Sequence, residues 1–189
     1  MNVNIVNNYY KAGPATLKRS ALIQRRIAGI GIRTTEYTHH GTTEANEWDK
    51  MWHVWGDFYV RGNVNSAHAD VTKDNWTYGI YNQIDNKQVD NTYTQRTKDT
   101  ICVTTPHPFY AVTTETAYKA YGKVLAYAGA CLHRDAVDQL LVNDTQNGTA
   151  TYTGTGNGRV PGIINNQNDI KPVGAGDDWS PWPMLKQDT

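Results

Sequence analysis

The sequence predicts a mainly β chain of the solenoid type with one helical segment. The first observation is composition: there are 16 glycines, 12 tyrosines and 6 tryptophans but only 2 phenylalanines. Together with frequent asparagine and threonine, this composition suits short strands joined by many turns. The second observation is an apolar alternation of period two at residues 51–61. The third is a helical spacing of apolar residues at 114–128.

The stretch at residues 51–80 gives the clearest β pattern in the sequence. Phe58 and Val60 fall on one parity of the alternation, and Tyr59 and Arg61 fall on the other. This is the period of a strand with one apolar face, and the residue types are strand formers. A glycine–asparagine pair follows and is typical of a turn. We therefore expect paired strands here, with the apolar parity directed toward the core.

The strongest helical pattern covers residues 114–128. Thr113 or Thr114 is the expected N-cap, and Gly129 is placed to end the helix in a left-handed conformation. Asp135 is the expected N-cap of a second, shorter helix that carries alanine, valine and two leucines. The sequence therefore predicts two helices in succession, separated by a short turn.

The formal charges balance, with 18 Lys and Arg against 18 Asp and Glu. A chain without net charge has no overall field that would attract nucleic acid or an anionic membrane, so neither is an expected partner. No apolar run approaches the roughly 20 residues that are needed to span a bilayer. The residues after Met1 are polar and alternate like a strand, so no signal peptide is visible.

Three ordered blocks of the sequence form a specific pattern. The first block is V-N-I-V-N-N-Y-Y-K-x-G-P-A-T at residues 3–16. The second is W-G-x-x-Y-V-x-G-N followed by V-T-x-D-N-W, at residues 55–76. The third comprises short matches at residues 117–118, 124–130, 134–138, 148–150 and 162–164. In this order the set resembles the bacterial pectate lyases of polysaccharide lyase family 1.

The resemblance implies a right-handed parallel β-helix with a C-terminal helical segment and long loops. On this interpretation residues 1–189 are a single domain, and Met1 falls within a late coil, so we expect a C-terminal portion of a longer lyase. The expected parts are the last coils at 1–80 with a basic loop at 11–50, a loop at 81–112, a helical segment at 113–145 and an irregular tail at 146–189.

Asparagines at equivalent turns of such a fold can stack along its axis. Asn7, Asn8 and Asn63 are the candidates for this ladder, and ordinary turns capped by their own side chains are the alternative.

The resemblance also implies a reaction. Family members cleave polygalacturonate by calcium-dependent β-elimination, with an arginine as the base and aspartates as calcium ligands. The strands that carry that arginine and those aspartates have no counterpart in this sequence, so no catalytic residue and no metal ligand is assigned. Whether this chain acts as an enzyme is left open. The resemblance further implies a secreted or periplasmic monomer whose partner is an acidic polysaccharide.

A different function class remains open beside the lyase portion. The chain could be a non-catalytic carbohydrate-binding solenoid that uses aromatic faces and the basic loop. Saccharide binding by the chain alone would favour this alternative, since an aromatic ring covers the apolar side of a sugar.

Basic residues that follow the first block are the candidates for substrate contact. We select Lys11, Arg19 and Arg26 for binding uronate carboxylates, because arginine can bind a carboxylate through two parallel hydrogen bonds. A solvated basic loop is the alternative for the same residues. Two further patterns stay open: a metal site at His39-His40 with nearby glutamates, and a disulfide between Cys102 and Cys131.

Overall fold

The computed structural model describes residues 1–30, 56–82, 99, 101–110, 112–155, 160–171 and 174–180. The chain forms two compact units. Unit 1 comprises Met1–Lys11 and Ser20–Gly122, and unit 2 comprises Ala12–Arg19 and Lys123–Thr189. The histidines at 39 and 40, with the glutamates near them, lie outside the described residues.

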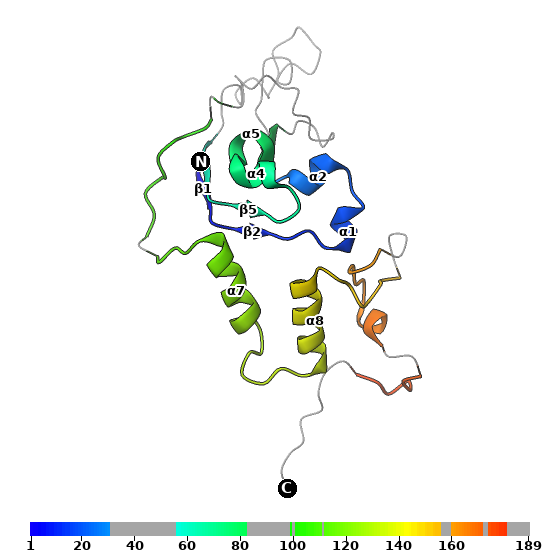
Figure 1. The fold of residues 1–189 in the computed structure, drawn as a ribbon. Helices are drawn as coiled ribbons and strands as arrows, with labels where there is room; N and C mark the ends of the chain where they lie inside the picture. Colours follow the sequence, from blue (N-terminus) through cyan, green and yellow to red (C-terminus); the bar gives the residue numbers. More distant parts are fainter. Residues whose placement is uncertain are drawn as a thin grey trace, which may run out of the picture. The chain divides into compact units, whose positions relative to one another are not determined.

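Unit 1 contains three pairs of parallel strands that join residues 2–10 and 28–30 to residues 57–82 (Figure 1). The pairs are β1 (Asn2–Val6) with β4 (Asp57–Arg61), β2 (Tyr9–Tyr10) with β5 (Val64–Asn65), and β3 (Ala28–Ile30) with β6 (Ile80–Asn82). The longest register runs from Asn2 opposite Asp57 to Val6 opposite Arg61. Beyond the other edge of β4, Cys102 forms a parallel bridge with Phe58.

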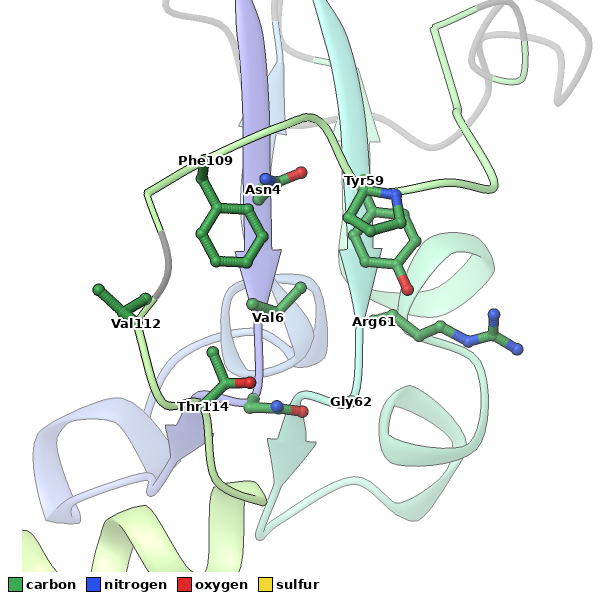
Figure 2. A pocket seen from close by; sticks show the side chains of 10 residues that line it. Asn4, Val6, Tyr59, Arg61, Gly62, Phe109, Val112 and Thr114 are labelled. Atoms are coloured by element: carbon green, nitrogen blue, oxygen red, sulfur yellow. The ribbon is translucent and has the colours of Figure 1, made fainter.

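The parity predicted for residues 57–61 is confirmed. Phe58 is 6% exposed and belongs to a buried cluster with three isoleucines, and Val60 packs against this cluster. Tyr59 and Arg61 lie on the opposite face of the strand pair (Figure 2). The alternation therefore separates a core face from an outer face. The isoleucines of the cluster are Ile30, Ile80 and Ile101.

Asparagines connect the turns beside these strands. The side chains of Asn8 and Asn63 are joined by a hydrogen bond of 2.9 Å, which is a single contact between neighbouring turns and not a ladder along a solenoid axis. The Asn63 Nδ2 also donates to the Ile5 carbonyl at 2.7 Å. Asn7 contacts the neighbouring turn through its backbone. Its φ of 55° is left-handed, and its backbone N–H donates to the Arg61 carbonyl.

Asn75 completes this network from the side of α5 (Asn75–Gly79). Its Oδ1 accepts from the Asn63 backbone N–H at 2.8 Å, and its Nδ2 donates to the carbonyls of Asn63 and Val71 at 2.8 and 2.7 Å. Asn63 and Asn75 are only 1% and 6% exposed. Buried backbone groups must find partners, and here one amide side chain serves three of them.

Short helices occupy positions that the sequence pattern assigned to strands or loops. In unit 1 these are α2 (Ala21–Arg25), α4 (Ala69–Lys73) and α5. The Asp74 side chain accepts from the Thr77 N–H at 2.9 Å and so caps α5. α1 (Pro14–Leu17) begins with proline at its first position and belongs to unit 2.

The expectation of a mainly β, right-handed parallel β-helix is wrong. The described residues form only short two-stranded parallel sheets, with no solenoid and no closed sheet, and about 36% of them are helical against 17% in strands. The strands are two to five residues long because turns and short helices follow them at once. The asparagine contacts between neighbouring turns are present without a continuous solenoid.

Both predicted C-terminal helices are present. α7 covers Ala117–Tyr127, and Gly129 follows it with a φ of +69°. The N-cap differs from the expected one, since Thr116 rather than Thr113 or Thr114 accepts from the Lys119 N–H. In unit 2, the Arg134 Nη2 donates to the carbonyls of Leu125, Ala126 and Ala128 and so satisfies the end of α7.

α8 covers Ala136–Asn147 in unit 2, and its caps explain its limits. The Asp135 side chain accepts from the Asp138 N–H at 2.9 Å, as predicted for the N-cap. Gly148 ends the helix with a φ of +69°. Further along, η2 (Gln167–Ile170) starts with a reciprocal capping box between Asn166 and Asp169.

The end of α8 is tied to the residues after it by Asp144. Its carboxylate accepts hydrogen bonds from the Thr149 hydroxyl at 2.6 Å and from the Thr151 N–H at 2.9 Å. These bonds favour the charged form and hold the pKa of Asp144 below its usual value, with the Thr149 bond as the largest cause. The stabilisation is therefore present above the ordinary carboxyl pKa and is lost as the pH falls through the lowered one.

We expect Thr149→Val to raise the pKa of Asp144 toward its ordinary value, because the variant removes the strongest of these hydrogen bonds. The measurement is an NMR titration of the Asp144 carboxyl carbon. Thr145→Val is the matched control, since the Thr145 hydroxyl donates to the Leu141 carbonyl and does not serve Asp144. An Asp144 titration that is the same in both variants and the wild type would contradict the assignment.

Candidate functional site

A cavity of about 540 Å³ opens on the outer face of the β1–β4 pair in unit 1, and we call it the sheet cavity (Figure 2). This volume is within the usual range for ligand sites. Strand register places Asn4 opposite Tyr59 and Val6 opposite Arg61, so the four side chains share the outer face. The other lining residues are Asn7, Gly62, Pro106, Phe109, Val112 and Thr114.

Residues of the segments 101–110 and 112–114 form the second wall of the sheet cavity. Asn4 holds the first of these segments through two hydrogen bonds, since its Nδ2 donates to the His107 carbonyl at 2.9 Å and its Oδ1 accepts from the His107 N–H at 3.0 Å. The His107 ring lies 3.2 Å from the Asp57 carbonyl. Phe109 is brought by this segment to the β1 side of the cavity, across from Tyr59 on β4 (Figure 2).

Arg61 is the charged group of the sheet cavity. It is the last residue of β4, and its side chain extends outward from the end of the strand (Figure 2). Among the described residues its guanidinium has neither an ion-pair partner nor a hydrogen-bond partner. An exposed guanidinium can bind a planar anion through two parallel N–H donors.

Gly62, which lines the cavity beside Arg61, is at a position that requires glycine. Gly62 has a φ of +71°, a conformation that favours glycine, and an added Cβ would collide with the Asn7 Oδ1. The turn therefore needs glycine where β4 ends. This turn fixes the direction in which Arg61 leaves the strand.

The three residues selected from the sequence for uronate contact lie outside the described lining of the sheet cavity. Lys11 places its Nζ 5.6 Å from the ring centre of Tyr121, which in turn stacks on Tyr9 at 4.4 Å. Arg26 is exposed at the end of α2, and Arg19 belongs to unit 2. Uronate contact by these three residues stays a prediction.

Arg25, the neighbour of Arg26, contacts other side chains of unit 1. Its Nη2 lies 3.0 Å from the Asp70 carboxylate, and its Nε lies 3.4 Å from the Nδ1 of His68. This cluster holds α2 beside the start of α4. Tyr81 lies within reach of the same charges, although burial is the main reason that its pKa is raised.

The described aspartates do not fit the calcium site that the resemblance implies. Asp70 is paired with Arg25, and Asp74 caps α5. Within the described ranges, no group of three or more His, Cys, Asp or Glu side chains is placed to hold a metal ion. No calcium-dependent step is therefore assigned to these residues.

Three further observations concern the cysteines, Trp76 and the helices. Cys102 is partly buried, Cys131 is exposed, and neither is in a disulfide. Trp76 packs against the core cluster and donates its indole N–H to Asp99 at 2.8 Å, as expected for a core tryptophan. Of the helices in the described ranges, none combines the length and the apolar character that crossing a membrane requires.

Sequence reasoning missed Arg61 and Tyr59 as site residues. Their parity already placed them on the outer face of β4, so the signal was present in the alternation itself. Phe109 gave no such signal, because it lines the cavity on a segment that the contact of His107 with Asn4 holds in place. In comparisons with known proteins, no family model, curated protein or solved structure matches this chain.

Proposed function

We propose that unit 1 binds an acidic oligosaccharide of the polygalacturonate class in the sheet cavity, as part of a pectate lyase-like protein. The observation that carries this proposal is Arg61. Its guanidinium is exposed at a cavity of about 540 Å³ and is not used by any described residue of the protein. A uronate carboxylate has the planar geometry and the charge that a guanidinium binds best.

The walls of the cavity suit a sugar ring. Phe109 and Tyr59 offer aromatic faces on its two sides, and such faces cover the apolar side of a pyranose (Figure 2). The hydroxyls of Tyr59 and Thr114 can each donate and accept hydrogen bonds. A mainly apolar hollow with a few polar groups is the usual composition of a small-molecule site.

The sequence blocks at residues 3–16 and 55–76 support the same ligand class, because they resemble proteins that act on polygalacturonate. Both blocks contribute to the sheet cavity, through Asn4 and Val6 in the first and through Tyr59 and Arg61 in the second. The proposal concerns binding and does not depend on a solenoid. Bond cleavage is a separate question, which the absorbance of an unsaturated product in the presence of calcium would answer.

The test is calorimetric titration of the full chain with digalacturonate and with a neutral galactose disaccharide. We expect digalacturonate to bind and the neutral sugar to bind at least about tenfold more weakly. Arg61→Gln should weaken digalacturonate binding by about tenfold or more, since one hydrogen bond to a charged group contributes about 1.5–3 kcal/mol. Lys119→Gln removes an equal charge from an exposed position on α7 and should leave the affinity unchanged.

Two outcomes would count against the sheet cavity. Equal affinity for the charged and neutral disaccharides would show that the carboxylate, and therefore its pairing with Arg61, does not contribute to binding. A loss of affinity in Lys11→Gln, Arg19→Gln or Arg26→Gln, with full affinity in Arg61→Gln, would move the uronate site to the residues chosen from the sequence.

A further inference from the structure

A second cavity of unit 1, of about 750 Å³, shares Tyr59, Arg61 and Gly62 with the sheet cavity. It also includes Val60 and residues of α4 and α5, and we call it the edge cavity. Arg61 thus lines both hollows. A ligand that binds the Arg61 guanidinium from one cavity would therefore lie next to the other cavity.

The edge cavity lies at an edge of β4 that is only partly paired. The Phe58 N–H donates to the Ile101 carbonyl at 2.8 Å, and the Phe58 carbonyl accepts from the Val103 N–H at 3.0 Å. Because alternate residues of a strand direct their N–H and C=O groups to the same edge, Val60 directs its pair to this edge as well. An adjacent donor and acceptor are what a sugar hydroxyl can bind, since it also both donates and accepts.

Lys73, the last residue of α4, supplies a second cation. It is exposed, lines the edge cavity, and has no ion-pair or hydrogen-bond partner among the described residues. Of the two acidic residues of the same wall, Asp70 is paired with Arg25, and Asp74 keeps its charge while it accepts the Thr77 N–H as the cap of α5. The wall therefore offers an anionic ligand one available cation in addition to Arg61.

We infer that the two cavities form one site for an oligomer with at least two carboxylates, with Arg61 binding one carboxylate and Lys73 another. This inference rests on the proposed function and adds to it a second binding position and a minimum ligand length. A dimer held at Arg61 fills the sheet cavity alone. A longer chain continues past Gly62 to the open edge of β4 and to Lys73.

The test is calorimetric titration of the full chain with galacturonate oligomers of two, three and four units. We expect the affinity to rise with length. Lys73→Gln should lower the affinity for the tetramer by about tenfold while leaving the dimer unchanged, whereas Arg61→Gln should weaken binding of every length. Lys73→Arg keeps the charge and should retain most of the tetramer affinity, and Lys119→Gln is the matched charge control.

The outcomes separate this inference from the proposed function. If the dimer binds through Arg61 but length adds nothing, or if Lys73→Gln affects dimer and tetramer equally, the second position is refuted and the sheet cavity stands. If no oligomer of any length binds to the wild-type chain, both the proposed function and this inference are refuted. A length-dependent gain that is lost in Lys73→Gln and kept in Lys73→Arg supports the inference.

Discussion

Replacing Asn75 with alanine is expected to destabilise unit 1 by about 3–5 kcal/mol. The amide of Asn75 serves the backbone N–H and C=O of Asn63 and the carbonyl of Val71, all within hydrogen-bond distance. Each buried polar group that is left without a partner costs about 1–3 kcal/mol. Since whole domains are stable by only about 5–15 kcal/mol, this loss would be a large share of the total.

Urea denaturation followed by circular dichroism is the measurement for Asn75→Ala. Asn143→Ala is the matched control, because Asn143 is exposed on α8 and its replacement should change the free energy of unfolding by no more than about 0.5 kcal/mol. A loss below about 1 kcal/mol in Asn75→Ala would mean that water takes over the hydrogen bonds of the amide, and that the network is not buried as described.

Phe58→Ala is the second large effect that we expect, at about 3–5 kcal/mol. Phe58 is 6% exposed and lies in the cluster with Ile30, Ile80 and Ile101. Its backbone also bonds to residues 101 and 103, so the side chain supports strand pairing on that side of β4. Truncation leaves a cavity among well-packed neighbours, and the lost contacts add to the lost burial.

The control for Phe58→Ala is Asp57→Ala, one position earlier on the same strand. The Asp57 side chain is exposed, and the strand pairing uses only its backbone. Thermal unfolding of the two variants should therefore differ by several degrees or more. Similar unfolding temperatures would show that β4 does not separate a core face from an outer face.

Local patterns in the sequence predicted individual strands and helices, although the fold class inferred from them is wrong. The alternation at residues 57–61 identified Phe58 as core and Tyr59 as outer, because a strand of five residues is long enough to show its period. The two C-terminal helices were also found, with Asp135 and Gly129 at their ends, since caps are chosen by local chemistry.

The short helices could not be predicted in this way. α4 and α5 have five residues each, fewer than the two turns over which a helical period becomes visible. Their valine, threonine and tryptophan are strand formers by propensity, and tertiary contacts override that preference. One such contact is the hydrogen bond from the Asn75 amide to the Asn63 carbonyl. Another is the burial of the Val71 side chain, which is 0% exposed.

The candidate site could not be predicted from local patterns. Lys11, Arg19 and Arg26 were chosen for their charge and for their place after the first sequence block, whereas the proposal for Arg61 rests on its cavity and on its lack of a described partner. The pairing of Asn4 with His107 joins residues 103 positions apart, and no local pattern encodes such a contact. Cavities arise where distant segments meet, so composition and period do not reveal them.

The parallel register of unit 1 has a consequence for how the chain folds. Asn8 meets Asn63 across 55 positions of sequence, whereas Arg134 reaches the Leu125 carbonyl across only 9. The entropy lost on closing a loop must be offset by contacts that form later, so distant pairings form slowly. The helices of unit 2 should therefore assemble well before β1 meets β4. In the interval, β4 exposes an apolar face and two unpaired edges, and refolding is best carried out at low protein concentration.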